Sequence, residues 1–159
     1  INRLPPPRWR KNAFIVLILL GIFLPPCGSI VRLHPCQLAY YSALCGGLPG
    51  ANRIGLETTY WCDGLTRSFL KEMNRTIPPG SKLRPMSMNW DLVKYWQERG
   101  VLREDIEVPS EGPYDFHLLQ CRQGMFTQAE WFFYRHMKPL LVQERDGVPL
   151  FALYGPLPQ

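Results

Sequence analysis

The sequence lacks the residue patterns of the common catalytic and metal sites. It has no GxSxG motif, no CxxC pair and no Cys/His set with the spacing of zinc ligands. Its 13 acidic residues are scattered, and no two of them form a clear pair for acid–base chemistry. We therefore expect no catalytic residue, no metal site and no cofactor within this chain. A Cys/His nucleophile pair stays open, because five cysteines and three histidines are present.

The folded part of the chain also lacks an excess of charge. Residues 1–11 hold four basic residues and no acid, and residues 12–31 hold no charge at all. Residues 32–159 hold the other 14 basic side chains and all 13 acids, a net charge of +1. A nucleic-acid-binding domain needs a basic face on its folded part, so we expect no nucleic-acid partner. The short basic cluster beside an apolar run suits anionic lipid head groups instead.

One apolar run is long enough to cross a bilayer, which needs about 20 residues in a helix. We predict a transmembrane helix over residues 11–31, bent near its end by Pro25 and Pro26. The alternative is a secretory signal peptide, since the residues before Cys27 look a little like a lipoprotein cleavage box. That box needs small residues before the cysteine, and two prolines stand there.

The basic residues predict the orientation of this helix. Four precede it, against Arg32 and the distant Arg53 after it, so residues 1–10 are expected to be a cytoplasmic tail. The rest of the chain then lies on the outer side, in the periplasm of a bacterium or the lumen of a eukaryotic compartment. The first residue is Ile1 rather than Met, which indicates a piece of a longer protein, a processed chain or an incomplete gene model.

Residues 32–63 are interpreted as a junction at the membrane surface. A short helix is expected over residues 37–44, followed by a tight glycine-rich turn at residues 46–50. The turn lacks the lysine and the following Ser/Thr of a P-loop, so it is a weak sign of nucleotide binding. Tyr40 and Tyr41 are typical of an interfacial aromatic belt.

Residues 64–159 are predicted to form a small α/β (α+β) domain of four or five strands and three helices. Pro85 confines the first strand to an edge, and Asp146-Gly147 predicts a hairpin between the last two strands. Asp63 and Asn89 are expected to cap the first two helices, and a capping box at residues 127–130 opens the third. The expected helices cover residues 63–73, 89–98 and 127–137, and the expected strands cover residues 82–86, 106–108, 116–120, 140–145 and 148–154.

The cysteines and histidines allow several interpretations. Cys36, Cys45 and Cys62 lie close enough in sequence for one disulfide on an oxidising side of a membrane, and the odd count leaves a thiol free. The alternative is that the cysteines are small buried hydrophobic residues. His117 lies in an apolar strand and is interpreted as a structural histidine, while His136 lies near a helix C-terminus, where a cation is favoured.

The junction carries a motif with a family resemblance. It reads His34-Pro35, Leu38, Tyr40-Tyr41, Leu44, Gly46-Gly47-Leu48, Gly50-Ala51, and then Glu57-Thr58-Thr59-Tyr60-Trp61. With the preceding helix, this order resembles the C-terminal region of GT-C type membrane glycosyltransferases, relatives of protein mannosyltransferases and of the aminoarabinose transferases of lipid A. Ser42 stands where Asn is common, so no role of that Asn is carried over.

The resemblance implies a polyprenyl-phosphate-linked sugar donor and an acceptor on the outer face of a bacterial inner membrane. It also implies further transmembrane helices upstream and a catalytic carboxylate in the first outer loop between them, so this chain alone would be inactive. A divalent metal in the whole enzyme is left open. The residues expected to help form the rim of the carrier or acceptor site are His34, Tyr40, Tyr41, Gly46, Gly47, Glu57, Tyr60 and Trp61.

Two other functions stay open at this point. One is a single-pass, membrane-anchored periplasmic domain that binds a partner and catalyses nothing. The other is a secreted thiol-dependent or lipoprotein-type protein.

Overall fold

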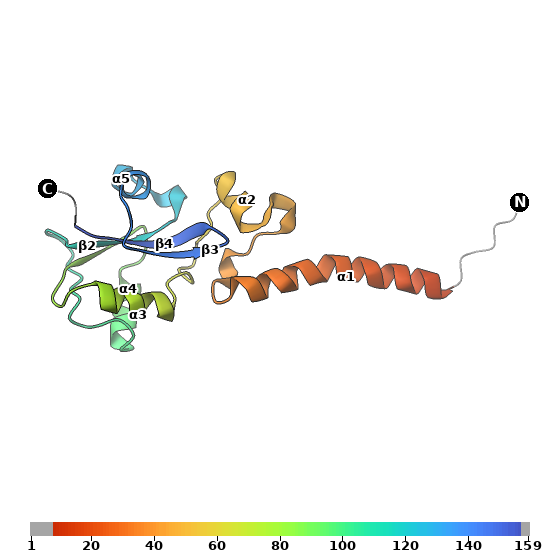
Figure 1. Ribbon diagram of the computed structural model, residues 1–159, viewed down its shortest axis with the longest axis horizontal. Coiled ribbons are helices and arrows are strands. Elements are labelled where there is room, and N and C mark those ends of the chain that lie inside the picture. Colours follow the sequence, from red (N-terminus) through yellow and green to blue (C-terminus); the bar gives the residue numbers. More distant parts are fainter. Residues whose placement is uncertain (1–7, 157–159) are drawn as a thin grey trace, which may run out of the picture.

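The computed structural model describes residues 8–156, and it shows one long helix that projects from an α+β domain (Figure 1). The predicted fold class is confirmed: a mixed sheet of four strands carries three helices, and one long apolar helix and one short helix precede them. The helices are α1 (Arg8–Leu33), α2 (Gly47–Arg53), α3 (Arg67–Thr76), α4 (Asp91–Glu98) and α5 (Gln128–His136). The strands are β1 (Leu83–Met86), β2 (Phe116–Gln120), β3 (Leu141–Arg145) and β4 (Val148–Tyr154).

Helix α1 continues through both prolines and ends at Leu33, two residues beyond the predicted end. Its window from Asn12 to Leu33 is long and apolar enough to cross a membrane. Pro25 and Pro26 have no N–H, so the carbonyls of Gly21 and Ile22 lose their usual partners four residues on.

The sheet has the strand order β1-β2-β4-β3. β1 pairs with β2 in parallel, and the other two pairs are antiparallel. The predicted hairpin joins β3 to β4, with Asp146 and Gly147 at positive φ, and Pro85 lies in edge strand β1 as predicted.

The strand expected at residues 106–108 is wrong. Within residues 8–156 that segment makes one isolated bridge, between Lys82 and Glu107. Leu83 donates its N–H to the Glu107 carbonyl on the outer side of β1. Pro85, two residues on, faces the same side without an N–H, so the ladder cannot continue.

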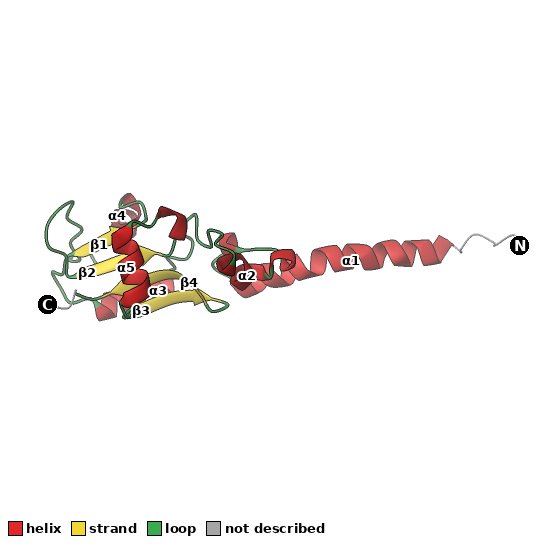
Figure 2. Cartoon of the chain, turned by 90° about the horizontal axis from the view of Figure 1, so that it is seen from above, coloured by secondary structure: helices red, strands yellow, loops and turns green. Residues whose placement is uncertain are grey.

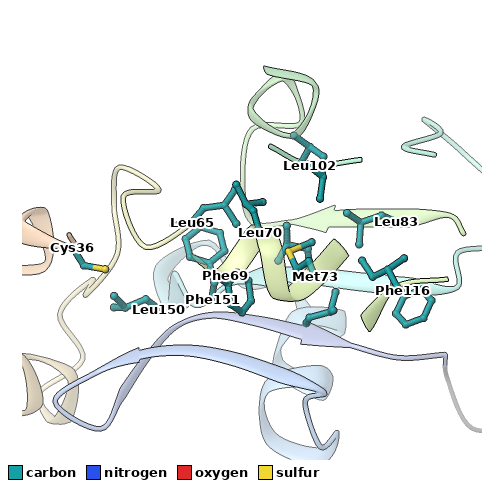
Figure 3. Close-up of a cluster of buried hydrophobic side chains, with 14 of the residues drawn as sticks. Cys36, Leu65, Phe69, Leu70, Met73, Leu83, Leu102, Phe116, Leu150 and Phe151 are labelled. Atoms are coloured by element: carbon teal, nitrogen blue, oxygen red, sulfur yellow. The ribbon is translucent and has the colours of Figure 1, made fainter. Parts of the chain in front are cut away.

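Helices α3 and α4 cover one face of the sheet and α5 covers the other (Figure 1, Figure 2). Phe69, Leu70 and Met73 of α3 pack against Leu83, Phe116 and Phe151 of the sheet (Figure 3). Because both faces are covered, all five residues of β2 are buried, as in a strand of a layered α/β core.

The first residues of α3, α4 and α5 test the predicted N-caps. Asp63 does not cap α3; Thr66 does, because its Oγ1 accepts a hydrogen bond from the Phe69 N–H at 3.2 Å. Asn89 Oδ1 accepts from the Asp91 N–H at 2.9 Å, at the start of α4. The capping box between Thr127 and Glu130 is present at the start of α5, as predicted.

The helix expected over residues 37–44 is wrong. The segment forms two short 3-10 turns, η1 (Gln37–Ala39) and η2 (Ala43–Cys45), because Tyr40 and Ser42 adopt extended backbone conformations between them. The glycine turn is present but short: Gly46 has φ 82° and α2 begins at the next residue.

All five cysteines are free thiols, so no disulfide joins Cys36, Cys45 and Cys62. Cys36 and Cys121 are buried as small hydrophobic residues, whereas Cys27 is exposed on α1.

Candidate functional site

A cleft of about 410 Å³ lies at the carboxyl ends of the parallel strands β1 and β2. Ser87 and Asn89 follow β1, and Gln120 and Arg122 lie at the end of β2. Tyr60, Trp61 and Cys62 of the junction close the third side. In sheets with parallel strands, ligands bind beyond the carboxyl ends of those strands, so this position is the favoured one for a site.

The cleft opens at the end of the sheet nearest α1, where strands β1 and β2 finish. Arg32 near the end of α1 makes an ion pair of 2.7 Å with Asp146 in the turn between β3 and β4. β4 starts at that turn and runs antiparallel to β2, so the carboxyl ends of β2 and β1 lie at the same edge (Figure 1). Arg145, beside the turn, also donates to the carbonyl of His34, which fixes the domain on the helix end.

The one predicted acid of the site, Glu57, is paired. Its carboxylate accepts from Arg122 Nε at 2.9 Å, and both side chains are partly buried. The Arg122 guanidinium also lies 4.1 Å from the centre of the Tyr60 ring. Gly124 makes room for the pair, because a Cβ there would overlap the Glu57 carboxylate. Glu57 therefore positions Arg122 and is not a free general base.

Tyr60 and Trp61 form an exposed aromatic pair beside the cleft. Their ring centres lie 4.8 Å apart in an edge-to-face arrangement, and Trp61 is 69% exposed. A tryptophan side chain is usually buried in a core or against a partner, because moving a large apolar ring out of water lowers the free energy. Trp61 is therefore unusually exposed. Its place at the mouth of a polar cleft provides a flat apolar platform for a ligand.

Two residues of the cleft have backbone conformations that side chains rarely adopt. Cys62 has φ 62° and Ser87 has φ 55°. Such conformations cost free energy and gather at functional sites. The Ser87 Oγ is buried and has no hydrogen-bond partner among the described residues. A ligand hydroxyl or a water in the cleft would satisfy it.

Cys62 is a hydrogen-bond donor and not a nucleophile. Its Sγ donates to Gln120 Oε1 at 3.1 Å, and Gln120 Nε2 donates to the Thr59 carbonyl at 2.8 Å. Burial, and then the neighbouring Asp63 carboxylate, raises the pKa of the Cys62 thiol, while Gln120 and Arg122 lower it. The thiol is therefore protonated near neutral pH, whereas a nucleophile needs the thiolate.

The predicted site residues fall into two groups, which one hydrogen bond from Tyr41 links. Glu57, Tyr60 and Trp61 belong to the cleft. Tyr40, with the turn that leads to Gly46 and Gly47, lies on the other side, beside α1. The Tyr41 hydroxyl links the two groups by donating to the Glu57 backbone carbonyl. His34 belongs to neither group: it lies at the end of α1, with Nδ1 2.6 Å from Gln37 Nε2.

Seven residues that line the cleft were not predicted as site residues: Cys62, Ser87, Met88, Asn89, Met125, Gln120 and Arg122. The polar run that directly follows the apolar part of β2 is the signal that could have indicated the last two. No local pattern marks the unusual backbone of Cys62 or Ser87. Between residues 8 and 156, no three His, Cys, Asp or Glu side chains come together in a way that could hold a metal ion.

No family model, no curated protein and no solved structure matches the chain. What the structure itself defines is an α+β domain carried on a helix that is long and apolar enough to cross a membrane.

Proposed function

We propose that the chain is the C-terminal part of an integral-membrane glycosyltransferase of the GT-C type. The whole enzyme moves a sugar from a polyprenyl-phosphate carrier to an acceptor on the outer face of the bacterial inner membrane. Helix α1 is a membrane span with its N-terminus in the cytoplasm, and the α+β domain lies in the periplasm. The motif at residues 34–61, the length and apolar character of α1 and the preceding basic cluster support this proposal.

The observation that carries the proposal is the position and chemistry of the cleft. It combines an exposed aromatic pair with planar polar groups on Asn89, Gln120 and Arg122, and it lies at the edge of the domain that contacts α1. A sugar ring has an apolar C–H face, which packs on an aromatic ring, and hydroxyls, which need a few placed donors and acceptors. A sugar linked to a membrane lipid would arrive at this edge.

The chain contributes binding groups to the reaction. The catalytic carboxylate comes from the first outer loop of the same enzyme, upstream of this chain. The upstream helices are expected to pack on α1. Glu57, Tyr60 and Trp61 form the sugar side of the rim, and Tyr40, Gly46 and Gly47 form the membrane side. Tyr41 links the two sides, and His34 lies at the end of α1 outside both.

A transfer assay tests the proposal. Membranes that contain the whole gene product are given a labelled polyprenyl-phosphate sugar, and label in the acceptor is measured. Trp61→Ala and Glu57→Gln are expected to lower transfer about tenfold, the effect of losing roughly 1.4 kcal/mol of binding in the transition state. Phe132→Ala is the matched control. It removes an exposed aromatic ring from α5, a helix that contributes no residue to the cleft, and it keeps full transfer. Unchanged transfer in both cleft variants would refute the role of the cleft.

One observation favours a second function, a membrane-anchored domain that binds saccharide and catalyses nothing. Glu57 is the acid beside the cleft, and its carboxylate is already paired with Arg122. On this alternative, the gene product binds the sugar and no label reaches an acceptor under any condition.

A further inference from the structure

Residues 33–52 contain no Asp, Glu, Lys or Arg, although all of them after Leu33 lie outside the helix that could cross a membrane. The stretch starts after Arg32 and ends before Arg53, and it contains η1, η2 and most of α2. A loop of 20 residues on a water-soluble domain would normally carry several charges, because Asp, Glu, Lys and Arg are about a quarter of soluble sequences. The lack of charged side chains therefore favours an apolar surrounding for this segment.

This uncharged segment folds back along α1. A second cavity, of about 320 Å³, separates the two; Gly21, Ile22, Pro25 and Pro26 line one side, and Tyr40, Ser42, Ala43 and Leu44 line the other. Figure 1 and Figure 2 both show α2 and the turns before it beside the half of α1 nearest the domain.

The depth of the contact follows from helix geometry. At 1.5 Å per residue, the interval from Leu33 back to Pro26 is about 10 Å, and back to Gly21 about 18 Å. Half of the hydrocarbon core of a bilayer is about 15 Å thick. If Leu33 lies at the membrane surface, η2 therefore lies inside the hydrocarbon, near its midplane.

The outer face of this segment is apolar and uncovered. Leu44 is fully exposed and Leu38 is 62% exposed, whereas Leu48 and Ala51 of α2 face the domain and are buried. On a domain in water, a fully exposed leucine beside the mainly apolar turn of η2 would cost free energy. Beside a span that crosses a membrane, the same leucine contacts lipid chains at no cost.

The backbone of the segment also suits an apolar surrounding. The N–H groups of Cys45, Gly46 and Gly47 donate to carbonyls within the turn, and the Leu38 N–H donates to Asp63 Oδ2. In hydrocarbon, irregular backbone needs such internal partners. The two prolines free the carbonyls of Gly21 and Ile22 on the side of α1 that lines the cavity, and the Ser42 hydroxyl lies on its opposite wall.

We propose that residues 33–52 form a re-entrant segment that lies in the half of the bilayer nearest the domain, with Leu44 and Leu38 in contact with lipid acyl chains. Arg32 and Arg53 mark the membrane surface at its two ends. This inference rests on the part of the proposed function that makes α1 a membrane span. It needs neither a sugar nor a transfer reaction.

Fluorescent labels at single cysteines test the depth. An environment-sensitive fluorophore is attached in turn to Ile18→Cys in α1, Leu44→Cys in η2 and Ser110→Cys in an exposed loop of the domain, and the chain is reconstituted in phosphatidylcholine vesicles. Cys27, Cys45 and Cys62 are replaced by serine, and buried Cys36 and Cys121 stay. Lipids with a nitroxide on the acyl chain or on the head group then quench the label according to its depth.

The inference predicts strong quenching at positions 18 and 44 by the acyl-chain nitroxide and none at position 110. Quenching at 18 with a water-exposed label at 44 would overturn the re-entrant segment and leave the span intact. A label at 18 in water would overturn both. An apolar but unquenched label at 44 would mean that a second copy of the chain covers Leu44, and it would overturn lipid as the contact.

The unaltered chain provides a second readout. Backbone amides outside helices and strands normally exchange with solvent quickly. In vesicles, residues 38–47 are expected to exchange about tenfold more slowly than the loop at residues 109–113, since water is absent from the hydrocarbon. Equal exchange of the two segments would contradict the proposed depth.

Discussion

Thr66 is the residue whose replacement tests the fold most sharply, because one hydroxyl has two roles. Its Oγ1 accepts from the Phe69 N–H at the start of α3 and donates to Gln143 Oε1 of β3 at 3.0 Å. Thr66 and Gln143 are both buried, so water cannot replace the lost partner. Thr66→Ala removes the cap and leaves a buried amide oxygen without a donor.

The cost of Thr66→Ala follows from these two losses. A lost N-cap costs about 1 kcal/mol, and an unsatisfied buried acceptor costs about 1–3 kcal/mol. Ser68 Oγ lies 2.9 Å from Thr66 Oγ1 and can recover part of the second loss. We therefore expect a loss of about 2–3 kcal/mol in the free energy of unfolding, which lowers Tm by about 8–12 °C at about 4 °C per kcal/mol for a domain of this size.

Thermal unfolding followed by circular dichroism measures the effect, and two variants control it. Thr66→Ser keeps the hydroxyl and is expected to lose less than about 1 kcal/mol. Adding Gln143→Leu to Thr66→Ala removes the unsatisfied oxygen and should restore part of the loss, because replacing both partners of a buried hydrogen bond is nearly neutral. If Thr66→Ala and Thr66→Ser unfold at the same temperature, the assigned cap is wrong.

Two further predictions concern pH and the junction. Burial, and then the Arg84 charge, lowers the pKa of His117 below its usual 6.5. Below about pH 6.5 the unfolded state therefore binds more protons than the folded state. The free energy of unfolding then falls with pH by at most ~1.4 kcal/mol per pH unit. Urea unfolding between pH 7.5 and 5 should show this slope, His117→Phe should remove it and His136→Gln should keep it. Gly50→Ala should lower Tm by several degrees, because the new Cβ would overlap the Cys45 carbonyl. Gly28→Ala should leave Tm unchanged, because the space around Gly28 is open. Equal Tm values for the two variants would contradict the described turn.

Local sequence signals predicted the elements that local forces determine. Asp146-Gly147 predicted the hairpin because the turn needs positive φ at both positions, which both residues adopt. The capping box predicted the start of α5 because its two hydrogen bonds join residues only three apart. Pro85 predicted an edge strand because it cannot donate to a neighbour.

The wrong predictions depended on contacts between distant residues. Asp63 and Thr66 are both good capping residues, and the choice follows from Leu38, whose N–H binds Asp63, and from Gln143, which binds Thr66. The strand expected at residues 106–108 fails because of a proline in its neighbour, which a single strand pattern does not reveal.

The candidate site was predictable only in part, for the same reason. Glu57, Tyr60 and Trp61 were identified from their order in the junction, and the structure places them at the cleft. Arg122, 65 residues from Glu57, joins them through the pairing of β1, β2 and β4, and no pattern within the junction indicates it.

The central claim is that the cleft binds the sugar of a lipid-linked donor at the membrane surface. Its most direct measurement is binding by the chain in lipid nanodiscs, titrated with polyprenyl-phosphate sugar and, separately, with the same polyprenyl phosphate without sugar. The account predicts that the sugar-bearing lipid binds at least about tenfold more tightly, a difference of ~1.4 kcal/mol, and that Trp61→Ala removes the difference. Equal affinity for the two lipids in the unaltered chain would contradict the account.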